Sequence, residues 1–196
     1  MGVLKTLTNE YFGEDIRKED LIDISGVDIV SFTDNNGKFH KHGYRVQKCN
    51  PNVMATTLSK LIYAIIEKRG TECSLNDIDV SNIEQMCFLG KNNIRYGIFQ
   101  YNDFNGDISG WNVSNVKDMR CMFYYSKFTG KNGIFKLKED NQVEDMRQMF
   151  RNSQFDGNIE DWKIKDDCFI GDMFYNTPLA RNNNYPQWFK DRNGMK

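Results

Sequence analysis

A pattern of apolar and polar positions returns along the second half of the chain with a period of about 24 residues. Its most complete copy is FNGDISGWNVSNVKDMRCMF, residues 104–123. Another copy begins at Phe155, and the hexapeptide 118–123 (DMRCMF) is matched by 145–150 (DMRQMF). A unit of this length is too short for a domain and too long for a heptad. It therefore predicts a solenoid, in which stacked units bury each other's apolar faces.

The apolar spacing changes within one copy, and the change predicts local structure. Trp111 and Val113 are two positions apart, as on a short strand with one buried face. Val116, Met119 and Met122 follow at helical spacing, which predicts a short helix. Asn, Asp and Gly residues then turn the chain into the next copy. We therefore expect about four coils, each with a short strand and a short helix.

Six core positions of the first copy align with those of the most complete copy at unchanged spacing. They are Leu75, Ile78, Val80, Ile83, Met86 and Leu89, which correspond to Ile108, Trp111, Val113, Val116, Met119 and Met122. Residues 92–102 are then expected to be an insertion between the first and second copies. The third copy starts at Phe128, and the fourth reaches Pro178. The aromatic tail 185–189 is expected to cover the open end of the array.

The first part of the chain has a different pattern. Residues 27–32 alternate as in a strand, the Asp-Asn-Asn-Gly sequence at 34–37 favours a hairpin turn, and residues 38–47 return as a second strand. A helix is expected over 53–68, because apolar residues recur there on one face and Gly70 follows two basic residues.

These patterns together predict an α+β fold with two parts. Residues 1–70 are expected to form an N-terminal hairpin and capping helix. Residues 71–196 are expected to form a repeat solenoid with a C-terminal cap.

The repeat also resembles a known family. Residues 106–119, with Met122 and Phe123, are similar to the BspA-type leucine-rich repeats of bacterial surface proteins. The resemblance covers about residues 71–180, and it implies a leucine-rich-repeat solenoid with a binding role and no catalytic residues. Asn132 and Asp167 depart from the family's apolar positions, so distortion is expected in the third and fourth copies. Many members are secreted, while short members without a signal sequence occur in bacteria and their phages.

Composition and charge narrow the possible partners and compartments. The chain has 196 residues with 26 Lys and Arg against 27 Asp and Glu, a net charge of −1, so it has no overall attraction to nucleic acid. Five widely spaced cysteines without a Cys-x-x-Cys pair favour free thiols in a reducing compartment. Residues 1–10 lack a signal-peptide apolar run. We expect a soluble protein in the bacterial cytoplasm that does not bind membranes.

The outward positions of the predicted strands provide the candidate site. If Trp111 and Val113 point inward, then Asn112 points outward, and so do the equivalent positions in the other copies. Stacking would bring four lysines side by side, either as a solvated sheet face or as a cationic patch for an acidic protein surface or a nucleic-acid backbone. The candidate partner-binding residues on this face are Asp79, Asn112, Lys136, Lys138, Lys163 and Lys165.

A second candidate surface lies on the N-terminal hairpin. His40 and His42 are the only histidines and share one face of a predicted strand, with Lys38, Lys41 and Arg45 as neighbours and no acidic residue beside them. We expect a cationic surface strand rather than a metal site, and no cofactor or small-molecule substrate. Neither a Gly-rich phosphate loop nor an arguable catalytic triad is present, so the protein is not expected to be an enzyme. A hydrolase that uses His40 or His42 is the weakest alternative.

The leading hypothesis is non-catalytic binding of a protein or ribonucleoprotein partner inside a bacterial cell. The resemblance suggests the setting, a phage-borne inhibitor of host defence machinery such as an anti-CRISPR protein. One alternative is a fragment of a surface-displayed adhesin. Another is a nucleic-acid-binding module that uses the four lysines.

Overall fold

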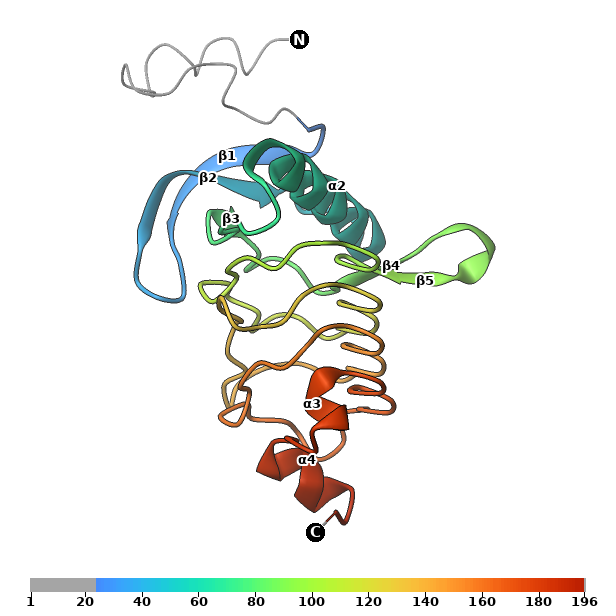
Figure 1. Cartoon of the computed structure of the whole chain (residues 1–196). Coiled ribbons are helices and arrows are strands. Elements are labelled where there is room, and N and C mark those ends of the chain that lie inside the picture. The colour runs from blue at the N-terminus through green and yellow to red at the C-terminus, as the bar shows by residue number, and fades with distance from the viewer. Residues whose placement is uncertain (1–23, 196) are drawn as a thin grey trace, which may run out of the picture.

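The computed structural model describes residues 24–195 and contains helices and short strands (Figure 1). The expectations for residues 1–23 lie outside the described residues. The mixed composition agrees with the predicted α+β class. The elements are β1 (Val27–Thr33), β2 (Phe39–Val46), α2 (Pro51–Arg69), β3 (Ile78–Asp79), β4 (Cys87–Leu89), a 3-10 turn η2 (Lys91–Asn93), β5 (Arg95–Gly97), α3 (Pro178–Arg181) and α4 (Gln187–Arg192).

The predicted N-terminal hairpin is confirmed. Strands β1 and β2 pair antiparallel, and the Asp34 carboxylate accepts the N–H groups of Asn36 and Lys38, which closes the turn between them. Strand β2 also pairs in parallel with β3, where Tyr44 lies opposite Ile78. The hairpin therefore shares one sheet with the first of the repeats.

The predicted capping helix is confirmed as α2, which begins two residues earlier than expected. Asn50 caps its first turn by accepting the N–H of Asn52, Pro51 occupies the first helical position, and the chain leaves the helix at Gly70. The buried face includes Leu58, Leu61, Ile62 and Ile65. Helix α2 lies across one end of the stacked segments that follow (Figure 1).

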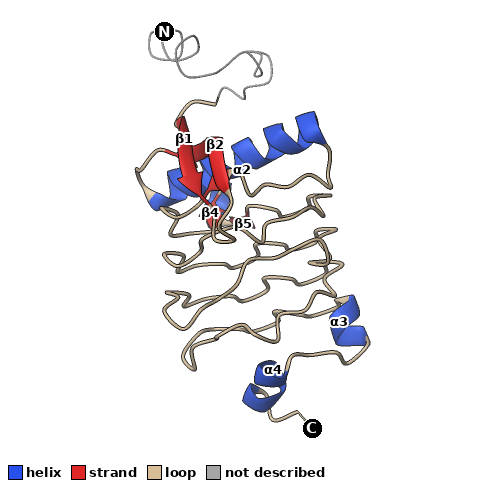
Figure 2. Cartoon of the chain, turned by 90° about the vertical axis from the view of Figure 1, so that its left-hand side faces the viewer, coloured by secondary structure: helices blue, strands red, loops and turns tan. Residues whose placement is uncertain are grey.

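Between α2 and α3 the chain runs in stretches that lie side by side (Figures 1 and 2). Parallel bridges join Gln85 to Asp118, Asp118 to Asp145, and Asp145 to Phe169. The stretches 117–126, 144–153 and 169–177 are thereby held next to one another in the order of the sequence.

The short helix predicted in each repeat is wrong. From Met122, every second N–H of the stretch 117–126 donates to a carbonyl three residues earlier. The N–H groups between them donate to carbonyls of the stretch 144–153. Cys121 and Tyr125 adopt positive φ angles of 55° and 54°, which a right-handed helix does not accommodate. Bonding to the neighbouring stretch thus replaces helical bonding, although the apolar spacing of the stretch suits a helix.

The short strand predicted at Trp111 and Val113 is also absent, but both side chains are buried as expected. A turn that ends at Trp111 and another that starts at Val113 bend the chain too sharply for a strand. The indole Nε1 of Trp111 donates to the Leu75 carbonyl at 2.8 Å, which ties it to the preceding copy.

The core is a continuous column of rings and apolar side chains. The ring centroids of Phe99, Phe123, Phe150 and Phe174 follow one another at 5.0, 5.4 and 5.8 Å. The Phe189 ring lies against Phe174 at 5.0 Å, so the aromatic tail covers the end of the column as predicted. A regular ladder of this kind requires neighbouring copies to be in register.

The expected position of the insertion is wrong. Leu89, assigned to the core by the alignment, is 43% exposed on β4. The β4–β5 hairpin leaves the stack inside the first copy and projects from its side (Figure 1). Ile98 and Phe99 then complete the core of that copy, and both are buried.

Candidate binding surfaces

The four lysines singled out by the sequence do not form an open cationic stripe. Lys136, Lys138 and Lys163 are exposed, whereas Lys165 is half-buried. Backbone pairing brings them together, since the Lys163 N–H donates to the Leu137 carbonyl at 3.0 Å.

Neighbouring groups occupy part of this lysine surface. The Lys138 ammonium donates to the Asn35 side chain of the hairpin turn at 3.1 Å. The Lys163 ammonium lies 3.7 Å from the Glu139 carboxylate. Asn112, which is exposed as expected, lines a shallow depression with Lys136 and Lys138. The positive field of the lysines is therefore partly compensated.

Asp79 is not an outward binding residue, and its assignment as one is corrected. It is only 6% exposed, because β3 pairs with β2 and the Arg45 guanidinium covers the carboxylate, with its Nε 2.7 Å from Oδ2. Burial opposes ionisation of Asp79, but hydrogen bonds from Ser81 and Arg45 outweigh it and lower its pKa. Asp79 and Arg45 thus join the hairpin to the repeats.

The expectation that no acidic group accompanies the histidines is also wrong. His40 Nε2 lies 2.9 Å from Asp34 Oδ2, and its ring stacks on Phe32 at 5.1 Å. His42 is half-buried, and burial together with the nearby Lys41 charge lowers its pKa. His40 therefore has a structural contact within the turn.

The structure shows a second surface, on the outer side of the stretches 117–126, 144–153 and 169–177. Its exposed aromatic side chains include Tyr101, Phe169 and Tyr175, at 64%, 61% and 56% exposure. We name it the aromatic–arginine face and define it by Arg95, Tyr101, Arg120, Tyr124, Tyr125, Arg147, Arg151, Phe169 and Tyr175.

Two arginines of this face are held against exposed rings. The guanidinium carbon of Arg147 lies 5.2 Å from the centre of the Phe169 ring, and that of Arg151 lies 4.2 Å from the centre of the Tyr175 ring. Cation–π contacts of this kind fix long side chains before any partner arrives. Because less side-chain freedom remains to be lost, the binding of a partner at this face would cost less side-chain entropy.

The arginine charges of the face are compensated within it. Asp118 accepts hydrogen bonds from Arg95 at 3.1 Å and from Arg120 at 3.0 Å, and Asp145 accepts from Arg147. Burial opposes ionisation of Asp118, but the Arg120 hydrogen bonds outweigh it and lower its pKa. The surface is therefore rich in arginine without being strongly cationic.

The outward positions of the predicted strands do not include this face, so the repeat pattern did not predict it. The sequence signal for this face is the Asp-Met-Arg motif, which occurs at 118–120 and again at 145–147. Tyr124 and Tyr125 follow shortly after the motif at 118–120. The predicted helix concealed the fact that Arg and Tyr positions of successive copies lie in rows.

The possible metal ligands, the thiols and the helices of the described residues also bear on function. Within residues 24–195 no group of three or more His, Cys, Asp or Glu side chains is placed to hold a metal ion. Burial raises the pKa of the Cys87 thiol to about 12 and that of Cys168 to about 11, so both are protonated at neutral pH. No helix in the described part of the chain has the length and apolar character needed to cross a bilayer.

Part of the chain is similar to one family of known proteins. Residues 67–141, from the end of α2 into the stacked stretches, match the model of a family described as "Mycoplasma protein of unknown function, DUF285". This family is associated with BspA-like surface repeat proteins. Comparison with curated proteins and with solved structures gave no match.

Proposed function

We propose that the chain is a non-catalytic binding protein whose repeats form a BspA-type leucine-rich-repeat solenoid of about four coils. The parallel bridges from Gln85 through Asp118 and Asp145 to Phe169 support the solenoid, as does the ring column in the core. The observation that carries the binding role is the aromatic–arginine face, where three adjacent stretches contribute exposed rings and fixed guanidinium groups.

The partner on this face is a protein, alone or within a ribonucleoprotein. Tyr and Arg are enriched in the energetically dominant residues of protein interfaces. The compensated charge of Arg120 and Arg147 supports a protein surface over a nucleic-acid backbone, because polyanion binding depends on uncompensated cations that displace counterions.

The setting of this activity is a separate proposal, and the sequence resemblance is its only support. We place the protein in the bacterial cytoplasm as a phage-borne inhibitor of host defence machinery, anti-CRISPR-like in role. A fragment of a surface-displayed adhesin is the alternative. A secretion signal encoded upstream in the full gene would favour the adhesin.

The test is affinity capture of partners from bacterial lysate, with and without nuclease treatment. We expect the triple variant Tyr125→Ser, Phe169→Ser and Tyr175→Ser to lose the captured partner, and we expect wild-type capture to survive nuclease. All three side chains are exposed, so the variant should unfold at the wild-type temperature. Capture that is unchanged in the triple variant would contradict the role of this face.

A second candidate function is contact with a nucleic-acid backbone through the lysine surface, which the exposure of Lys136, Lys138 and Lys163 favours. Reversal of these three and Lys165 to Glu is expected to leave the fold intact and to slow association at low salt. Capture lost on nuclease treatment, with a steep salt dependence, would support this candidate. If the fourfold variant binds like wild type at low salt, the lysines only solvate the surface.

A further inference from the structure

A groove runs along the stack from α2 to the C-terminal helices and meets the aromatic–arginine face at Tyr101. It consists of three adjoining depressions. The first lies beside Tyr63 and Glu67 of α2 and shares Thr71 and Asp103 with the second. The second shares Asp156 with the third, which ends at Pro186 before α4. We propose that this groove binds an extended, arginine-rich segment of a partner polypeptide.

The floor of the groove is a ladder of backbone hydrogen bonds. The N–H of Asn105 donates to the Thr71 carbonyl at 2.9 Å, and the N–H of Asp156 donates to the Thr129 carbonyl at 3.1 Å. Further rungs join 127 to 102 and 179 to 155. Neighbouring backbones in such a ladder lie about 4.8 Å apart, so five levels span roughly 20 Å, the length of about six extended residues.

The charge of the groove selects a cationic guest. Five carboxylates line it against two ammonium groups. Lys127 lies 3.2 Å from Asp103, and Lys131 lies 3.1 Å from Asp156, so these two acids are paired. The remaining carboxylates leave the groove with an acidic excess. The full set is Glu67, Glu72, Asp103, Asp156 and Glu160, with Lys127 and Lys131.

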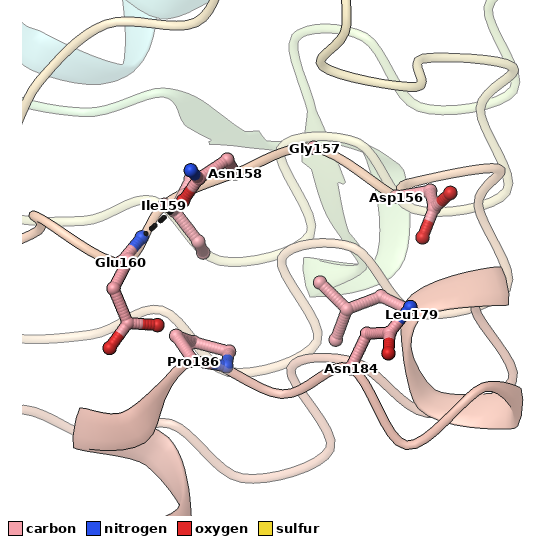
Figure 3. Close-up of a pocket in the computed structure, with 8 residues that line it drawn as sticks. All are labelled: Asp156, Gly157, Asn158, Ile159, Glu160, Leu179, Asn184 and Pro186. Atoms are coloured by element: carbon pink, nitrogen blue, oxygen red, sulfur yellow. Dashed lines mark hydrogen bonds between the residues drawn. The ribbon is translucent and has the colours of Figure 1, made fainter.

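The two ends of the groove favour arginine over lysine in the guest. At the α2 end, the rings of Tyr63 and Tyr101 are 47% and 64% exposed, and a guanidinium group stacks on such rings better than an ammonium does. At the other end, Asp156 and Glu160 lie on opposite sides of the depression, with Leu179, Asn184 and Pro186 between them (Figure 3). Glu160 already accepts the N–H of Gln187 at 3.0 Å, which fixes its carboxylate in place.

The groove lysines act as internal competitors of the guest. The side chains of Lys127 and Asp103 are 69% and 65% exposed, and ion pairs as exposed as this one are weak. A guest guanidinium can therefore displace Lys127 from Asp103 and bind the carboxylate with two parallel hydrogen bonds. Removal of the two lysine charges should strengthen binding, whereas removal of their acidic partners should weaken it.

The test uses a fluorescein-labelled peptide of alternating Arg and Ser, about six residues long to match the groove. Its binding is measured by fluorescence anisotropy at low salt. Against wild type, Asp103→Asn with Asp156→Asn is expected to weaken binding about tenfold, and Lys127→Gln with Lys131→Gln to tighten it up to about fivefold. Glu139→Gln with Asp140→Gln makes the same charge change on the lysine surface and should alter affinity less than about twofold. A peptide of alternating Glu and Ser should not bind.

Equal losses in the Asp103/Asp156 variant and in the Glu139/Asp140 control would overturn the proposal, since attraction would then be non-specific. Unchanged affinity in the Lys127/Lys131 variant would contradict guest contacts to Asp103 and Asp156. Thermal unfolding of each variant at the wild-type temperature excludes a folding defect. The double variant Phe169→Ser and Tyr175→Ser should bind the peptide normally, because neither residue lines the groove. Loss of peptide binding and loss of the captured partner can therefore be told apart.

Discussion

Arg120 joins two neighbouring stretches of the chain through Asp145. Its Nε lies 3.2 Å from Asp145 Oδ2 in the next copy, while the same nitrogen donates to Asp118 in its own copy at 3.0 Å. Asp118 and Asp145 are both 8% exposed, so these contacts are shielded from solvent. The pairs thus fix the register in which one copy meets the next.

Acid is expected to weaken the fold through Asp118. Its native pKa lies below the ordinary 3.8, so ionised Asp118 stabilises the protein above the unfolded-state value, and this contribution is lost as the pH falls through the native value. Asp34 and Asp79 act in the same direction. We expect the free energy of unfolding, measured in urea, to fall as the pH drops below about 4. Asp118→Asn should show a shallower fall, and an identical acid slope would contradict this role.

Trp111→Ala is expected to destabilise the protein by about 3–5 kcal/mol, because it deletes a large core ring and its hydrogen bond to the Leu75 carbonyl. The measurement is the urea unfolding midpoint. Phe39→Ala is the control, since Phe39 is exposed on β2, and it should change stability by less than about 0.5 kcal/mol. If Trp111→Ala unfolds at the wild-type midpoint, Trp111 does not contribute to the core.

Gly106→Ala is expected to cost about 3 kcal/mol or more, since a Cβ there would lie 1.8 Å from the Cys73 carbonyl oxygen in the preceding copy. Gly171→Ala is the matched control, because a Cβ at Gly171 meets only the flexible Arg147 side chain at 3.7 Å. Thermal unfolding should separate the two variants clearly. Equal stability would mean that the copies do not approach each other as closely as the structure shows.

Thiol labelling of the native protein is expected to be dominated by Cys49. Cys49 is exposed, whereas Cys87 and Cys168 are buried with raised pKa values of about 12 and 11, which leaves little reactive thiolate near pH 8. Cys49→Ser should therefore abolish the fast phase of reaction with a chromogenic disulfide. Burial also raises the pKa of the half-buried Cys73 and Cys121, so both should react slowly. A fast phase that persists in the variant would contradict the dominance of Cys49.

The sequence predicts the core better than it predicts the backbone. Repeated apolar positions such as Ile108, Val116 and Met149 are all buried, because burial depends on side-chain spacing that the sequence displays directly. The same spacing wrongly predicts helical bonding, since an apolar face does not reveal whether an N–H group bonds within its own stretch or to the next. A positive φ angle at positions such as Gln148 distinguishes bonding to the next stretch from helical bonding. Glutamine is not a residue type that indicates a positive φ angle, so the sequence does not predict it.

The candidate surfaces show a similar limit. The position of Lys163 beside Leu137 follows from the repeat frame, but the Lys138 contact to Asn35 joins residues 103 positions apart and depends on how the hairpin folds back. The same hairpin buries Asp79 beneath Arg45. A repeat alignment contains no information about an element outside the repeats.

Because the stacked stretches bond to one another in the same alternating way, the number of repeat copies in this protein can change. Asp118 meets Asp145 in the way that Asp145 meets Phe169, so a further copy of residues 128–154 placed in the chain would repeat contacts that already exist. Each added copy would extend every outer surface by one row. Gene duplication can therefore enlarge an outer surface of this protein without any new kind of packing having to arise.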